Sequence, residues 1–453
     1  MTLGAGSLGA QVDSTTPPVV KPPPPPAPVP RPVARPPVPV RPVVPPAAKP
    51  ARAPTAAAPA AARPVPSRVF VGHAGPAGST EVRTKTGIVA RTAADGSLLD
   101  ALDARHGVSV HRGLDGGRSV VAERPGHVQV VSESSGAQYV AHPYVYHGRP
   151  FYRRSYVVDG RVLDRFYRHY ALPGYQLDVY APAQYYSPAL YAWAMAPWSK
   201  SVPYNWRSTN SPSSSYYSSY FTPSPSYSSP AAWLTDYVIA ASLKSAYSAK
   251  PANAAAETAA ATPLAPETKQ LVANEVARQT QQNSLDAAVT AQKKDVAPAV
   301  GGIAQVLSDK QPHVFVANSD LDLVDPSGRR CQISGGDVVQ VASPLKPGSP
   351  TTDVVVLASK GGSECEPAAN VEIALTDLQE MHNHMCETLD QGMAEIQTRE
   401  GHAGLPQLPA GATSAPVAAT FTATAPPPDA NAVAEVGELN PAADEIEQAA
   451  SAT

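Results

Sequence analysis

The sequence has few cysteines, no long apolar run and no recognisable catalytic motif. Three cysteines in 453 residues are too few for a disulfide-dense scaffold. No apolar run reaches the roughly 18 residues of a membrane-spanning helix, so we predict no transmembrane span. The sequence signatures of nucleophile elbows, zinc proteases, phosphate loops and dinucleotide folds are missing. We therefore predict no catalytic residue and no cofactor.

Charge is also scarce and is unevenly spread. Asp, Glu, Lys and Arg make up 16% of the residues, against roughly 25% in an average soluble domain. Residues 1–67 carry seven Lys or Arg and one acid, Asp13, whereas no Lys or Arg follows Arg399. The net charge of −3 thus combines a basic arm with an acidic tail at residues 400–453. We expect both ends to be long disordered termini.

Residues 11–67 form a linker rich in Pro, Ala and Val, and 21 of the chain's 51 prolines precede Ser67. This composition favours an extended polyproline II spacer over docking onto a proline-recognition module. The first ten residues lack the basic and long apolar regions of a complete signal peptide, but their small residues resemble the end of one. Two interpretations stay open: a start codon placed too late, with a mature chain from Gln11, or a plain disordered N-terminus.

Short stretches of alternating apolar and polar residues begin at Arg68 and are separated by turn signals. The glycine of each turn pair supplies the positive φ of a tight hairpin. The pairs are Asp95-Gly96, Asp115-Gly116, Pro125-Gly126, Ser135-Gly136, His147-Gly148, Asp159-Gly160 and Pro173-Gly174. Their spacing predicts a meander of hairpins, in which residues 97–107 are either a short helix or another pair of strands.

Aromatic residues are concentrated in one stretch of the chain. All 19 tyrosines and all four tryptophans lie between Tyr139 and Tyr247. Because each buried ring removes a large apolar area from water, we assign residues 68–247 to one Tyr/Trp-rich β-hairpin domain. It ends in a helix that begins at Trp233. Within it, the Ser/Tyr/Pro run of residues 208–230 predicts a mobile loop.

The second half of the chain predicts a linker followed by a small barrel. Residues 248–300 are a helical, Ala-rich linker in which a helix opens at Pro266. Residues 301–399 hold five or six short strands, which suit a small barrel, and then an amphipathic helix over 376–399. The apolar stripe of this helix is a candidate contact for a homo-oligomer. The stripe consists of Leu378, Met381, Met385, Leu389, Met393 and Ile396.

The cysteines lie in this last unit. Export favours a disulfide between Cys331 and Cys365 over two buried thiols, with a stabilisation of roughly 3–4 kcal/mol. Cys386 is left over, either as a free thiol or as a link between chains. His382 and Cys386 are four residues apart and can share a helix face, but two ligands do not make a metal site. We predict no metal.

Arginine alternates with aromatic residues in FYRR (151–154) and DRFYRHY (164–170). An exposed face of this kind suits contacts with surface polymers or protein partners, because Tyr and Arg contribute strongly to interfaces. The stretch lacks the strongly basic groove of a single-strand nucleic-acid binder, so we predict no nucleic acid. The predicted binding residues are Tyr152, Arg153, Arg154, Tyr156, Arg165, Tyr167 and Arg168.

The tyrosine-rich middle (YVYHGRPFYRRSYVVDGRVLDRFYRHY) and the later stretch PHVFVANSDLDLVDPSGRRCQISGGDVVQV resemble a group of uncharacterised secreted bacterial proteins. The resemblance covers residues 68–400 and implies export and a similar architecture, without an activity. Residues 207–219 are Ser-rich here, whereas the group is rich in Gly, Trp and Tyr. The last unit also resembles Src-homology-three-like bacterial barrels, which implies a binding or wall-associated module.

These patterns together predict a mainly β protein with short helices. It contains a β-hairpin meander domain, a small Src-homology-three-like barrel with a C-terminal helix, and long disordered termini. The expected role is that of a non-enzymatic envelope or extracellular protein, secreted or periplasmic, that binds surface polymers or partner proteins. The alternative is an enzyme acting on cell-wall polymers. A deep cleft lined by close carboxylates favours the enzyme, and a shallow aromatic face favours binding.

Overall fold

The structure, a computed structural model, describes the chain from residue 77 onward with short gaps. The described ranges are 77–133, 136–173, 175–203, 217–249, 261–291, 302–309, 311–342, 344–346, 348–361, 364–402 and 405–451. The predicted basic arm and signal-like start lie outside these residues. All that follows concerns the compact unit that begins at Pro64.

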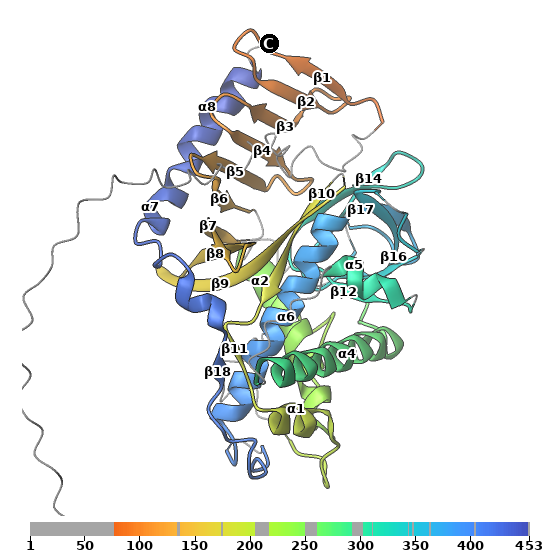
Figure 1. Cartoon of the computed structure of the whole chain (residues 1–453). Helices are drawn as coiled ribbons and strands as arrows, with labels where there is room; N and C mark the ends of the chain where they lie inside the picture. The colour runs from red at the N-terminus through yellow and green to blue at the C-terminus, as the bar shows by residue number, and fades with distance from the viewer. Residues whose placement is uncertain are drawn as a thin grey trace, which may run out of the picture. The chain divides into compact units, whose positions relative to one another are not determined.

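The fold is mainly β, as predicted, and its largest element is a ten-stranded antiparallel sheet (Figure 1). Each strand pairs with the next one along the chain, which makes the sheet a continuous meander. Residues 97–107 belong to a strand pair, β3 and β4, and not to a helix. The strands are β1 (Thr80–Arg83), β2 (Val89–Thr92), β3 (Leu98–Asp103), β4 (Val108–Arg112), β5 (Arg118–Arg124), β6 (Val128–Ser132), β7 (Gln138–Tyr146), β8 (Arg149–Val158), β9 (Arg161–Leu172) and β10 (Tyr175–Ala181).

The predicted glycine turns join these strands. Six of the seven glycines have positive φ, and the seventh, Gly174, lies outside the described residues. In two turns the preceding residue is also left-handed: His147 and Asp159 both have φ of 49°. Two consecutive residues with positive φ define the two-residue hairpin whose twist matches that of the strands. Local turn chemistry therefore explains the meander.

Side chains alternate between the two faces of the sheet, and the faces differ in chemistry. In β4, Val110 points to one face and His111 to the other. The first, which we call the aliphatic face, carries Ile88, Ala101, Val108, Val110, Val120, Ala122, Val130 and Val140. The second, the polar face, carries Asp100, His111, Tyr139, Arg154, Tyr156, Arg165 and Tyr167.

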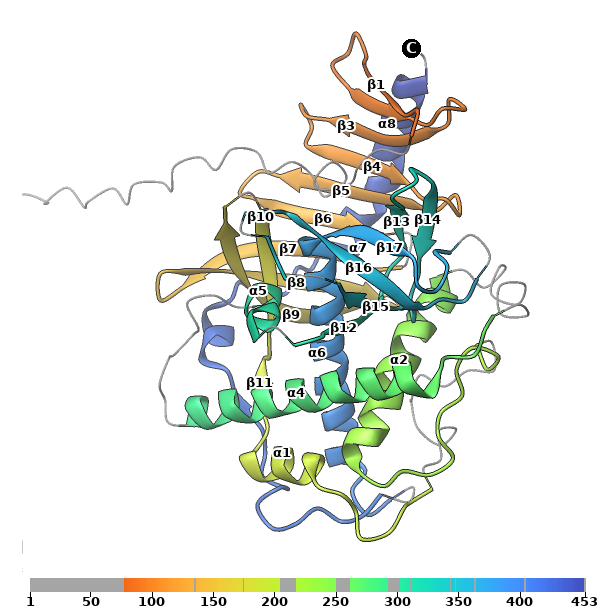
Figure 2. The ribbon, with the colours of Figure 1, turned by 90° about the vertical axis from the view of Figure 1, so that its right-hand side faces the viewer.

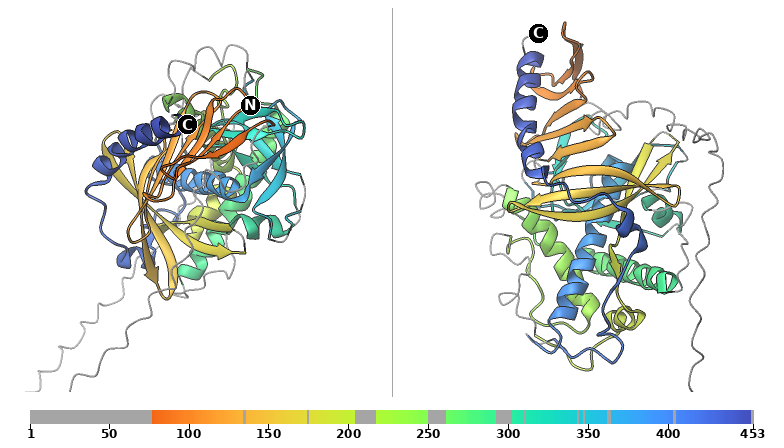
Figure 3. Two further views of the ribbon diagram at one scale, coloured as in Figure 1. Left: turned by 90° about the horizontal axis from the view of Figure 1, so that it is seen from above. Right: turned by 60° about the vertical axis from the view of Figure 1, so that its left-hand side comes forward.

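Helices α7 (Ala432–Gly437) and α8 (Leu439–Ser451) cover the aliphatic face (Figure 3). The predicted disorder of the acidic tail is therefore wrong for residues 405–451. The tail is held by both apolar and charged contacts. Leu439 is buried against the strands, and the Glu447 carboxylate accepts two hydrogen bonds from Arg112, at 2.7 and 2.6 Å. Asp444 binds Arg118. The composition of the tail suggested disorder because its charge partners, Arg112 and Arg118, lie more than 300 residues earlier in the chain and cannot be recognised from the tail alone.

The middle of the chain forms helices and packed loops. The predicted helices at Trp233 and Pro266 are confirmed as α2 and α4. The predicted mobile loop is wrong for residues 217–229: Tyr217, Tyr220 and Tyr227 are buried, and the Tyr227 hydroxyl donates to Asp236 at 2.9 Å. The elements are β11 (Gln184–Tyr185), α1 (Pro188–Met195), α2 (Pro230–Ala249), α4 (Pro266–Ala291), α5 (Ile303–Val306) and the 3-10 helix η2 (Leu307–Asp309).

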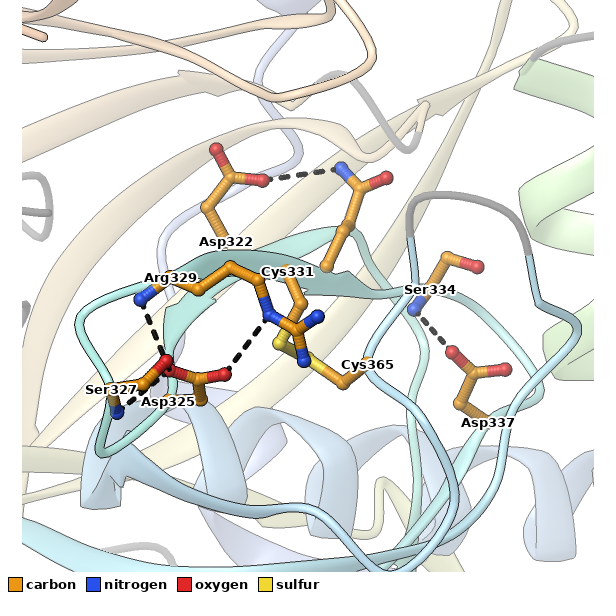
Figure 4. The surroundings of a disulfide bond; sticks show 9 residues. Asp322, Asp325, Ser327, Arg329, Cys331, Ser334, Asp337 and Cys365 are labelled. Carbon is orange, nitrogen blue, oxygen red and sulfur yellow. Dashed lines mark hydrogen bonds and ion pairs between the residues drawn. A yellow bond between two sulfur atoms is a disulfide. The ribbon is translucent and has the colours of Figure 1, made fainter.

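The last unit contains a four-stranded antiparallel sheet and a separate hairpin. The sheet has the order β12-β15-β16-β17, and β13 pairs with β14. The predicted disulfide is confirmed: it joins Cys331 of β14 to Cys365 (Figure 4). The elements are β12 (Val314–Val316), β13 (Leu321–Val324), β14 (Arg330–Ile333), β15 (Val338–Val341), β16 (Thr351–Ala358), β17 (Asn370–Ala374), α6 (Leu375–Thr398), β18 (Val417–Ala418) and the 3-10 helix η3 (Thr420–Thr424).

Helix α6 lies at the centre of the described unit, where it packs on β10, α2 and α4 (Figure 2). All six residues of its apolar stripe are buried by this same chain. The stripe is thus not available for the predicted homo-oligomer contact. A side chain at Gly392 would meet Leu234 of α2 at 2.6 Å, so the two helices cross closely. None of the helices in the described ranges is both long and apolar enough to cross a membrane.

Candidate binding cleft

A cleft of about 720 Å³ lies between the polar face of the ten-stranded sheet and the elements opposite it. One wall is formed by β3–β5 and β7–β9. The other is formed by α2, the hairpin β13–β14 and α6. This size falls within the roughly 300–1,000 Å³ typical of ligand sites. The cleft is therefore a candidate ligand site.

Arg154 lies behind the wall of the cleft, where it binds the lining residue Glu380. Its side chain is 2% exposed, and its guanidinium donates two hydrogen bonds of 2.9 Å to Glu380 of α6. A third, also 2.9 Å, goes to Asp178 of β10. The guanidinium lies 3.9 Å from the ring centre of Tyr167 and 4.9 Å from that of Tyr139. This buried cation ties two strands to α6 and is satisfied by carboxylates and rings together.

The electrostatics of this centre follow from those contacts. Burial alone would raise the pKa of Asp178, but the hydrogen bond from His169 and the charge of Arg154 lower it to about 2. Two helical turns after Glu380 on α6, the Glu387 carboxylate accepts a hydrogen bond from the Tyr167 hydroxyl and forms an ion pair with Arg165. Burial raises the pKa of Glu387 in spite of Arg165. Two carboxylates that contact this group of arginines therefore have opposite pKa shifts: the pKa of Asp178 is lowered and that of Glu387 is raised.

Asp322 of β13 closes the opposite end of the cleft. It binds Arg330 at 2.5 Å and accepts the backbone N–H of Leu114 at 3.0 Å. Its carboxylate also lies 3.7 Å from His111 of the sheet, and His111 is hydrogen-bonded to Asp100 at 2.7 Å. In Figure 4, Asp322 points away from the disulfide that joins Cys331 of the same hairpin to Cys365. The hairpin is therefore fastened to the sheet on one side and cross-linked on the other.

His384 of α6 also lines the cleft. Its Nε2 atom is buried and has no hydrogen-bond partner among the described residues. Burial, and then the charge of Arg165, lowers the pKa of His384 to about 4. The ring is neutral near pH 7, with a nitrogen free to pair with a ligand.

The predicted binding residues are divided by the structure between the two faces of the sheet. Tyr152, Arg154, Tyr156, Arg165 and Tyr167 share the polar face. Arg154 and Tyr167 are buried, while Tyr152, Tyr156 and Arg165 are half-buried. The prediction of an exposed aromatic–Arg face is therefore wrong for the buried members, because α6 covers them.

Arg153 and Arg168 lie on the other face and do not join this group. Arg153 is buried, donates to the backbone oxygen of Pro426 and binds Asp164. Arg168 lies over the ring of Phe151, at 5.8 Å from its centre. Both arginines support the packing of the C-terminal segment around Phe421, and neither lines the cleft.

Sequence reasoning missed the second wall. Asp377, Glu380, His384, Glu387 and Gln391 all line the cleft from α6. Their alternating spacing of three and four residues places them on one helical stripe. That spacing is visible in the sequence beside the apolar stripe. The spacing does not show which surface this polar stripe faces, because the sheet opposite it is formed by residues more than 200 positions earlier in the chain.

A second cavity of about 400 Å³ lies between β10, α4 and α6. It contains His382 and Cys386, which do share a helix face, with 3.8 Å between the Cys386 sulfur and His382 Nδ1. Burial, followed by nearby carboxylates, raises the pKa of Cys386, and burial lowers that of His382 to about 4. Among the described residues no group of three potential ligands could hold a metal ion. A buried neutral thiol of this kind is a poor nucleophile.

No protein-family model matches the chain, and neither a curated protein nor a solved structure does.

Proposed function

We propose that the protein is an exported, non-enzymatic binding protein that takes a segment of a surface polymer into the cleft. The observation that carries this proposal is the cleft itself. It combines a ligand-sized volume with tyrosine rings, buried hydrogen-bonding groups and walls joined by ion pairs. Sites of this kind orient a ligand by a few polar groups on an otherwise preformed surface.

The rigidity of the walls supports binding. The innermost carboxylates are each held by an arginine: Glu380 by Arg154, and Glu387 by Arg165. Because the side chains are fixed before the ligand arrives, little entropy is lost when it binds. The disulfide supports export, since such bonds persist in oxidising compartments.

A cleft-blocking variant tests the proposal. Ala241 of α2 lines the cleft, and Ala241→Trp would fill part of it. Ala434→Trp, on the exposed side of α7, is the matched control. In a sedimentation assay with insoluble envelope polymer, we expect the wild type and Ala434→Trp to be pelleted and Ala241→Trp to remain soluble. If both variants were pelleted with the polymer to the same extent, the binding site would lie outside the cleft.

Export is tested separately, by fractionation of the native host with a C-terminal tag. We expect recovery outside the cytosol, with Cys331 and Cys365 oxidised. Recovery in the cytosol with both thiols reduced would overturn this part of the proposal.

One observation favours the alternative, a hydrolase acting on wall polymers. The cleft is lined by carboxylates, of which Glu387 has a raised pKa. A carboxyl that keeps its proton can act as a general acid. The same polymer preparation decides this point: soluble fragments released by the wild type and not by Glu387→Gln would establish an enzyme.

A further inference from the structure

The lining of the cleft is acidic. It contains eight carboxylate side chains and only four Lys or Arg. Adding Arg154, which binds Glu380 from behind the wall, leaves the carboxylates in excess. Since a cleft with low-dielectric walls focuses the field of its charges, a negatively charged polymer would be repelled from it. A positively charged one would be attracted.

Tyrosine rings are placed among these carboxylates. Tyr139 and Tyr156 lie side by side on neighbouring strands, with 4.9 Å between ring centres, and both line the cleft. Tyr237 of α2 lines it from the opposite wall. Aromatic faces beside carboxylates are suited to a ligand that presents both apolar C–H surface and protonated amines.

His384 is an independent indication of a ligand. Its buried Nε2 has no partner in the described structure, and it lies in the acidic wall between Glu380 and Glu387. An unpaired buried polar atom costs free energy until a partner reaches it. A ligand hydroxyl or amine that enters the cleft would supply that partner.

We propose that the cleft binds a polysaccharide segment rich in amino sugars with free, protonated amino groups. A sugar ring would lie against the half-buried Tyr156, ammonium groups would face the carboxylates, and a hydroxyl or amine would pair with His384. This inference rests on the proposed function, because it names the class of polymer that the cleft would hold.

The test compares two short oligosaccharides of equal length by titration calorimetry on the full chain. One is an oligomer of glucosamine at a slightly acidic pH, and the other is its fully N-acetylated form, which carries no charge. We expect the glucosamine oligomer to bind more tightly, and its affinity to fall with added salt. A lysine oligomer of the same charge should bind at least tenfold more weakly than the glucosamine oligomer.

Charge-removing variants locate the effect. Asp159→Asn with Asp320→Asn removes two lining charges, and Asn tolerates the left-handed backbone of residue 159. Asp353→Asn with Glu366→Gln removes two exposed charges outside the cleft. We expect roughly a three- to tenfold loss of affinity for the first pair, as for two partly exposed charge pairs. The second pair should bind like the wild type.

The outcomes separate this inference from the proposed function. Equal, salt-independent binding of the charged and acetylated oligomers overturns the inference and leaves polymer binding intact. Tight binding of the lysine oligomer shows a basic peptide to be the ligand instead. If neither sugar binds and Ala241→Trp is pelleted with envelope polymer like the wild type, the cleft is not the binding site and both proposals fail.

Discussion

The two faces of the ten-stranded sheet are covered in opposite ways. The aliphatic face is sealed by α7 and α8, mostly through small apolar side chains such as Val110 and Leu439. The polar face is bridged to α6 and β13 by charged groups and encloses a cleft between the bridges. One sheet thus combines a face whose core contacts are apolar, with added ion pairs such as Arg112–Glu447, and a face whose bridges to α6 are ionic. The difference predicts that the polar face is the more sensitive to single substitutions.

The largest effect is expected at Arg154. Arg154→Met removes the buried cation that Glu380 and Asp178 share, whose own side chains are only 18% and 19% exposed. Removing one member of a buried ionic cluster costs about 3–5 kcal/mol, so the free energy of unfolding should fall by that amount in urea denaturation. Arg161→Met, at an exposed position of β9, should change it by less than about 0.5 kcal/mol.

A second, milder variant at the same position keeps the prediction testable if Arg154→Met does not fold. Arg154→Lys keeps the positive charge but cannot form the bidentate hydrogen bonds to Glu380. Its free energy of unfolding should therefore lie between those of Arg154→Met and the wild type. If Arg154→Met were as stable as the wild type, the polar face would depend on packing alone, and the contrast between the faces would disappear.

A smaller effect is expected on the aliphatic face. Leu439 of α8 is fully buried, and Leu439→Ala removes methyl groups without leaving a charge unpaired. We expect a loss of about 2–3 kcal/mol, at the low end for Leu→Ala, because a helix near the chain terminus can shift into the space. Val433→Ala, at a position 49% exposed, is the control. A loss larger than that of Arg154→Met would reverse the comparison.

The smallest effect, when it is taken for a change of one pH unit, concerns pH. Burial raises the pKa of Asp390, whose carboxylate accepts from Tyr180 at 2.8 Å, from 3.8 to about 7. Between these values the folded state keeps a proton that the unfolded state has lost, so stability falls as the pH rises through this window and levels off above about 7. Asp390→Asn should remove this slope, which is at most about 1.4 kcal/mol per pH unit.

Urea denaturation at several pH values across the window measures this effect, with Asp353→Asn at an exposed position as the control. A slope that is identical in Asp390→Asn and the wild type would mean that the Asp390 carboxylate is ionised in the fold.

Local patterns were sufficient for much of the fold. The glycine turns place ten strands in order because each hairpin closes on its own neighbour, and the start of α2 near Trp233 and of α4 at Pro266 follow from short-range signals. The disulfide was also predictable, since it joins two elements of one small unit. The candidate site was predicted only in part: of the seven predicted residues, Tyr156 and Arg165 line the cleft, and the cleft-lining residues of α6 were missed.

The sequence by itself determined the meander, because turn residues and period-two alternation act over a few positions. It also determined that the side chains of each strand alternate between two faces. Only the tertiary structure decided what covers each face. Glu380 reaches Arg154 across 226 residues, and Glu447 reaches Arg112 across 335. Such pairs leave no local pattern, because the free energy that forms them comes from burial and charge pairing between segments that meet only in the folded chain.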